Sequence, residues 1–101
     1  MDITIKEERE RMVVMLSGEL DNTASRDAEK ALEPVMAQYD KDVEVDCQAL
    51  EYISSSGLRL MLNIYKHQSA IGKRAIISHL TDYNREVFLM GGFLTIYEEE
   101  E

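Results

Sequence analysis

The stretch that decides the fold reads Val45-Asp46-Cys47-Gln48-Ala49-Leu50-Glu51-Tyr52-Ile53-Ser54-Ser55-Ser56-Gly57-Leu58-Arg59. In its first part, apolar residues alternate with acidic ones, which predicts a strand with one buried face. Three serines and a glycine follow, and then apolar residues return at helical spacing. One face of this helix is expected to carry Leu58, Met61, Leu62 and Tyr65, with Leu60 and Ile64 beside them. A strand, a short loop and an apolar helix in succession predict an α/β domain.

Two strands are expected upstream. Ile3 and Ile5 alternate with polar residues, and Met12–Leu16 is a more apolar run that ends at Ser17-Gly18. The polar cluster between them predicts a hairpin turn. We expect these two strands to pair in an antiparallel manner.

A first helix is expected after Asp21-Asn22-Thr23, with Thr23 or Asn22 as its N-cap. Its apolar stripe would consist of Ala28, Ala31, Leu32, Val35, Met36 and Tyr39. Pro34 lies inside this pattern and removes one backbone hydrogen bond. The sequence therefore predicts a kink or a shortened helix at that point.

Downstream, Ala75–Ile77 is a short run without alternation, typical of an inner strand that is covered on both faces. A third helix would begin after Thr81 and end at Gly91-Gly92, and Thr95–Tyr97 would form a last edge strand. The order β-β-α-β-α-β-α-β predicts an α/β fold: a single-layer mixed sheet of four to five strands with helices packed on it. Residues 1–97 would form one domain, and residues 98–101 a solvated, frayed acidic tail.

Composition narrows the function. The chain has 101 residues, of which 45% are hydrophobic and 31% charged, as in a globular domain. Its net charge of -9 disfavours direct binding to nucleic acid. No apolar run approaches the roughly 20 residues that span a bilayer, and no secretory signal pattern opens the chain. We therefore expect a cytoplasmic protein without membrane insertion, in which the single cysteine, Cys47, is a buried thiol.

The three serines stand where a helix begins. The first turn of a helix leaves backbone N–H groups without intrahelical partners, and the helix dipole is positive there. A phosphate on a serine at this point meets donors that already face it, while adding about -1.5 to -2 charges to the surface. A simpler interpretation stays open, because serine before a helix is also a common N-cap.

The segment Tyr52–Leu62 resembles the signature of STAS domains, the sulfate-transporter and anti-sigma-factor-antagonist family. Gly18-Glu19-Leu20-Asp21 is similar to the turn that this family places between its second strand and first helix. Val45-Asp46 matches the strand before the serine loop, and Gly92-Phe93-Leu94 resembles the closing segment. The resemblance covers nearly the whole chain in the same order of elements.

The resemblance implies an anti-sigma-factor antagonist that is phosphorylated on Ser55, with Ser54 and Ser56 as competing acceptors because Ser54 replaces the family's usual aspartate. The implied partners are an anti-sigma factor that is a serine kinase and a serine phosphatase; the unmodified form would bind the kinase and release the sigma factor. The implied partner-binding residues are Asp21, Asn22, Thr23, Ser54, Ser56, Gly57, Leu58 and Arg59. The alternative is a STAS domain that is not phosphorylated and serves as an accessory subunit of a lipid-transport or signalling complex.

Other chemistry lacks support in the sequence. His67 lies twelve residues beyond Ser55 on the same expected helix, about 18 Å along its axis, so it cannot serve as a base for that hydroxyl. His79 could approach only through the fold, and no Gly-x-Ser-x-Gly elbow is present. One cysteine and two histidines show no metal-ligand spacing. We expect no catalytic residues, no metal and no cofactor, and hence a protein that is not an enzyme.

Overall fold

A five-stranded sheet forms the centre of the computed structural model, which describes residues 1–101. Its strands are β1 (Asp2–Glu7), β2 (Arg11–Leu20), β3 (Asp42–Ile53), β4 (Ala75–Ser78) and β5 (Glu98–Glu100), in that spatial order. The first two strands form the expected antiparallel pair, and the remaining neighbours are parallel. The prediction of a mixed sheet is therefore confirmed.

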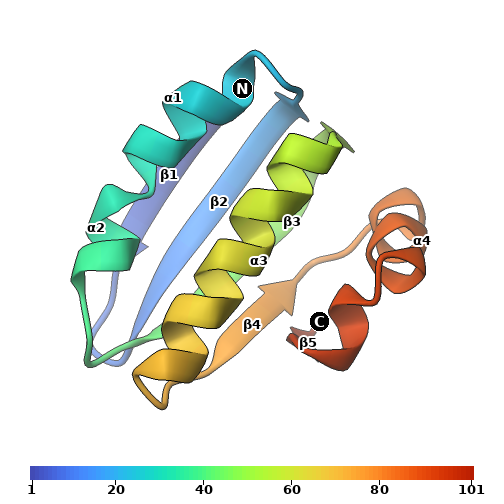
Figure 1. Ribbon diagram of the computed structural model, residues 1–101. Coiled ribbons are helices and arrows are strands. Elements are labelled where there is room, and N and C mark those ends of the chain that lie inside the picture. Colours follow the sequence, from blue (N-terminus) through green and yellow to red (C-terminus); the bar gives the residue numbers. More distant parts are fainter.

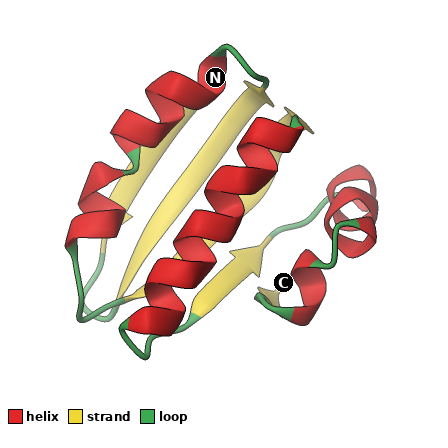
Figure 2. Cartoon of the chain, in the orientation of Figure 1, coloured by secondary structure: helices red, strands yellow, loops and turns green.

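The helices are α1 (Ala24–Ala31), α2 (Glu33–Ala37), α3 (Ser55–Ala70) and α4 (Asp82–Met90), followed by a short 3-10 turn at Phe93–Thr95. Figure 1 shows α1, α2 and α3 lying across one face of the sheet, whereas α4 and the 3-10 turn lie beyond β4 near the C-terminus. Figure 2, coloured by secondary structure, shows the same layer of helices in front of the strands. We call the face under α1, α2 and α3 the helical face, and the opposite face the open face.

The core lies on the helical face, toward which the buried side chains of the two long strands point. From Met12 to Leu16 in β2 and from Val43 to Cys47 in β3, every second side chain is buried and the residues between are partly exposed. Register shifts in the later part of the pairing change this spacing. This core consists mainly of Met12, Val14, Leu16, Val43, Val45, Cys47, Leu60, Met61, Ile64, Phe88, Phe93 and Tyr97. Cys47 has no exposed surface, and burial raises the pKa of its thiol to about 12, as expected for an unreactive cysteine.

The open face carries charged side chains in place of helices. Glu44 pairs with Ile76 in the β3–β4 register, and Ile76 pairs with Glu98, so these residues share that face. All four residues of β4 are buried, as predicted for an inner strand that is covered on both faces. On the open face the cover comes from side chains around Ile76, where Glu44 and Glu98 bind arginines.

Pro34 divides the first predicted helix, as expected, and lies in the first turn of α2, where its missing N–H costs least. The apolar stripe ends earlier than expected. Tyr39 is 77% exposed, so its place in the stripe is a wrong prediction. The chain has already left α2 at Gln38, whose backbone is extended.

The C-terminus differs most from expectation. Thr95–Tyr97 is not an edge strand, because a 3-10 turn occupies Phe93–Thr95 and buries Tyr97. The edge strand is instead β5, made entirely of glutamates, so the prediction of a frayed tail is wrong for Glu98–Glu100. Three arginines that are far apart in the sequence hold it. Arg74 binds Glu98 at 2.7 Å, Arg85 binds Glu99 at 2.7 Å and Arg11 binds Glu100 at 3.0 Å.

Candidate functional site

The serine loop lies at one end of the two longest strands. Parallel strands β2 and β3 run side by side to their last residues, where Leu20 pairs with Ile53. The backbone N–H of Ser54 then donates to the carbonyl of Leu20 at 2.9 Å. Because β2 and β3 are parallel and end side by side, the loop before α1 and the loop before α3 are neighbours.

Ser54 is the N-cap of α3. Its hydroxyl oxygen accepts a hydrogen bond from the Gly57 N–H at 3.2 Å, and its carbonyl accepts from the Leu58 N–H at 2.9 Å. The residue is 7% exposed. The simple capping interpretation thus applies to Ser54, whose hydroxyl is held inside the fold.

Gly57 allows α3 to begin close to the strand ends. A Cβ atom at this position would lie 2.7 Å from Ile53 Cγ1 and 2.9 Å from Leu20 Cγ. Such contacts are shorter than van der Waals packing permits, so any side chain would push the helix away from the sheet. Gly57 is itself buried, so it fixes the position of its neighbours.

Ser55 and Ser56 have different surroundings from Ser54. Ser55 is the first residue of α3 and is exposed to solvent. Ser56 is partly buried, and its hydroxyl donates to Asn22 Oδ1 at 2.9 Å, which ties the first turn of α3 to the loop before α1. Of the three hydroxyls, that of Ser55 stands at the positive end of the helix dipole without a protein partner.

The loop before α1 is held by Asp21. Its Oδ1 accepts from the Ala24 N–H at 2.8 Å, and its carbonyl accepts from the Ser25 hydroxyl at 2.8 Å. Thr23 occupies the residue before the helix with helical backbone angles and no side-chain cap bond. The prediction of Thr23 or Asn22 as the cap is therefore wrong; the carboxylate of Asp21 takes that role, which leaves Asn22 free to bind Ser56.

A polar groove of about 580 Å³ continues from this bridge between α1 and α3. It is lined by Asn22, Ser25, Arg26, Glu29, Ser56, Arg59, Leu60 and Asn63. Arg59 is exposed and reaches this groove, whereas Leu58 is half-buried against the core. Of the residues that the sequence predicts, the structure brings Asn22, Ser56 and Arg59 together at this groove. Asp21 and Thr23 line a separate hollow beside Gly18 and Glu19. Ser54 and Gly57 are buried beneath the start of α3.

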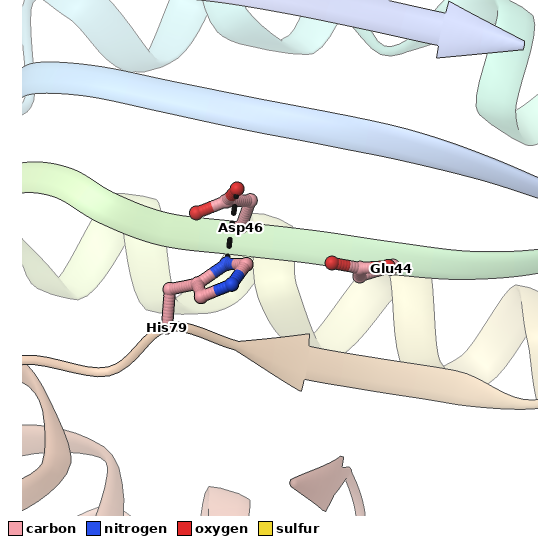
Figure 3. A group of neighbouring side chains, drawn as sticks. All are labelled: Glu44, Asp46 and His79. Atoms are coloured by element: carbon pink, nitrogen blue, oxygen red, sulfur yellow. Dashed lines mark ion pairs between the residues drawn. The ribbon is translucent and has the colours of Figure 1, made fainter. Parts of the chain in front are cut away.

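The two histidines lie away from the serine loop. His67 Nε2 is 2.7 Å from the carbonyl of Gln38, and His79 Nδ1 is 3.1 Å from Asp46 Oδ2. The second pair belongs to a cluster that the sequence did not reveal, formed by Glu44, Asp46 and His79 (Figure 3). Only the pairing of β3 with β4 brings these residues together, so linear spacing carried no signal for them.

No helix of the structure combines the length and the apolar character that crossing a bilayer requires.

Comparison with known proteins gives consistent matches. Residues 3–97 match the family model described as "Mlab, STAS domain". BtrV of Bordetella bronchiseptica, named as a candidate anti-sigma factor antagonist, is 28% identical over 97 residues, which are 96% of this chain and 84% of BtrV.

Solved structures share the fold. Phosphorylated SpoIIAA, a Bacillus cell fate determinant, aligns with a TM-score of 0.76 and 22% identity over 99% of this chain and 92% of its own. The unphosphorylated form, an anti-sigma factor antagonist, gives the same TM-score and identity and is covered over 88%. An anti-sigma factor antagonist of Mycobacterium paratuberculosis aligns with a TM-score of 0.85 and 19% identity, covering 97% of this chain and 83% of its own.

Proposed function

The chain belongs to the STAS domain family, and from that premise we propose that it is an anti-sigma-factor antagonist switched by phosphorylation of Ser55. In its unmodified form it binds an anti-sigma factor that is also a serine kinase, and this binding releases the sigma factor. A serine phosphatase restores the unmodified form. The protein acts in the cytoplasm as a binding switch and catalyses no reaction itself.

The observation that carries this proposal is the division of roles among the three serines. Ser54 caps α3, Ser56 bonds to Asn22, and the Ser55 hydroxyl faces solvent. A phosphate on Ser55 therefore leaves the cap in place. It also lies beside N–H groups of the first helical turn, which favour negative charge. The modification changes the surface charge and leaves the core behind Gly57 unaltered.

The polar groove between α1 and α3 lies beside Ser55 and supports the assignment of this surface as the partner contact. Asp21, Asn22 and Thr23 are exposed, and Arg59 is exposed on the first turns of α3. Ser54, Gly57 and Leu58 act from below by fixing that turn. The names of relatives agree with this proposal, because BtrV is named for anti-sigma antagonism and SpoIIAA has been solved with and without phosphate.

The direct test is incubation with ATP and the anti-sigma kinase encoded by the same organism, followed by intact mass and peptide mapping. We expect one added phosphate on Ser55 and none on the Ser55→Ala variant. Phosphate on Ser54 or Ser56 would move the site within the loop. No added phosphate with an active cognate kinase would overturn the switch.

Binding to the same partner gives a second readout. Ser55→Ala is expected to bind like the unmodified protein. Ser55→Asp is expected to bind about thirtyfold more weakly, because an uncompensated charge in an interface costs roughly 2 kcal/mol or more. Ser69→Asp is the matched control, since Ser69 is exposed near the other end of the same helix. Equal affinity of both aspartate variants would show that the serine loop is not the contact surface.

A second candidate function uses the same surface without covalent modification, as an accessory subunit of a lipid-transport or signalling complex. The observation in its favour is that Ser54 and Ser56 already have structural hydrogen bonds. In that case a partner complex would bind the Ser55→Ala variant normally and no kinase would modify the wild type. Copurification with a transporter permease would then replace copurification with an anti-sigma factor.

A further inference from the structure

We propose that Glu44, Asp46 and His79 form a binding site for a divalent transition-metal cation of the zinc class on the open face of the sheet. The site is independent of the serine loop, because its residues lie on β3 and at the end of β4. The ligand-bearing atoms of the three side chains lie within 4.8 Å of one another. Figure 3 shows Asp46 and His79 in contact, with Glu44 farther along β3.

The β3–β4 register explains the convergence. Asp46 pairs with Ser78, so the next residue, His79, lies directly beyond that pair. Glu44 is two residues before Asp46 and therefore points to the same face. His79 has a φ of 54° and is the only non-glycine residue with a positive φ. This turn brings its imidazole back over β3, where Nδ1 is 3.1 Å from Asp46 Oδ2.

Other groups orient the two carboxylates. The hydroxyl of Ser78 donates to Glu44 Oε2 at 2.6 Å, and the Gln48 N–H donates to Asp46 Oδ1 at 3.0 Å. Outer hydrogen bonds of this kind fix ligand orientation in metal sites. A carboxylate oxygen has two lone pairs, so these bonds can persist when a cation binds. The carboxylate side chains are only 12% and 18% exposed, which limits competition from water.

The donor set selects the cation. One imidazole nitrogen and two carboxylate oxygens suit zinc and its neighbours, whereas calcium and magnesium prefer oxygen ligands alone. Ligands at about 2.1 Å in a tetrahedral site lie about 3.4 Å apart, so the ligand atoms need to approach one another by at most about 1.4 Å, with water as the fourth ligand. Two carboxylates offset the nearby charge of Arg11, which binds Glu44 Oε1 at 2.7 Å. That guanidinium opposes a cation and makes the site weaker than a dedicated structural one.

Zinc chloride titrated into tag-free protein by calorimetry tests the site. We expect one equivalent to bind and the melting temperature to rise with zinc, since a ligand that binds only the folded state stabilises it. Magnesium chloride at the same concentration should cause neither effect. Absence of stoichiometric zinc binding, or equal binding of magnesium, would overturn the proposal.

Two variants locate the ion. His79→Asn keeps a residue that tolerates positive φ and removes the imidazole, and Asp46→Asn removes one carboxylate charge. Each is expected to weaken zinc binding by about tenfold or more, because even outer-shell changes reach that size. His67→Asn is the control, since the other histidine lies on α3 and contacts Gln38. Zinc affinity that is lowered in the control, or unchanged in His79→Asn and Asp46→Asn, would contradict the site. If one of these two variants fails to fold, the other alone decides the test.

Discussion

The two faces of the sheet are built from different interactions. The helical face is apolar, and there β2 and β3 bury every second residue of Met12–Leu16 and of Val43–Cys47. The open face is charged, and its contacts join distant parts of the chain: Arg11 binds both Glu44 and Glu100. Burial of apolar surface dominates folding stability, whereas partly exposed ion pairs contribute little each. The comparison teaches that the helical face determines stability, while the open face positions particular side chains.

The largest effect is expected on the helical face at Phe88. This side chain is fully buried and stacks edge-on against Phe93, whereas the next residue, Leu89, is 61% exposed. Phe88→Ala should lower the free energy of unfolding by about 3–5 kcal/mol, because it leaves a cavity. Leu89→Ala, the matched control on the same helix, should change it by less than about 0.5 kcal/mol. Urea unfolding of both variants makes the comparison, and similar losses would refute the assignment of the core.

A smaller effect is expected on the open face at Arg11. Arg11→Gln removes the charge that links Glu44 to Glu100, at a cost of about 1 kcal/mol. Arg9→Gln, two residues earlier and exposed, is the control and should be neutral. The same urea titrations measure both variants. A loss at Arg11 as large as that at Phe88 would mean that the ion pairs, and not the apolar core, dominate stability.

The smallest effect is expected for β5 in acid. The hydrogen bond from Arg11 lowers the pKa of Glu100 below its usual value. The ionised Glu100 carboxylate therefore contributes its full stabilisation above about pH 4.3, the pKa of a glutamate in the unfolded chain. This contribution is lost as the pH falls through the lower pKa of Glu100 in the folded protein. The protection factors of the Glu98–Glu100 amides, which compare the exchange rate with the intrinsic rate at the same pH, should fall in that range while Val43 and Val45 stay protected. Unchanged protection of β5 after its carboxylates are protonated would show that backbone pairing alone holds the strand.

The sequence predicted the features that depend on local periodicity. The apolar run in β2, the alternation in β3, the interruption at Pro34 and a helix after the serine run were all visible in the order of residues. β5 was missed because three glutamates have low β propensity. That strand exists because Arg11, Arg74 and Arg85 meet at one edge.

The candidate site was predictable to the same extent. The serine loop follows from a strand, a hydroxyl cluster and an apolar helix, so its position was evident. The roles of its members were not, because they depend on tertiary contacts: Leu20 and Ile53 crowd Gly57, and Asn22 reaches Ser56 across 34 residues. The cluster around His79 depends on strand register and on one left-handed residue. Neither feature has a linear pattern.

The most direct test of the central claim is a nitrogen–proton amide spectrum of the protein with phosphoserine incorporated genetically at position 55. Since Ser55 faces solvent at the start of α3, we expect shifts confined to residues 54–59 and the loop at Asp21–Thr23. Core amides such as those of Val45, Phe88 and Tyr97 should not move. Shifts spread through the core, or loss of the folded spectrum, would contradict a switch that adds charge to the surface without altering the fold.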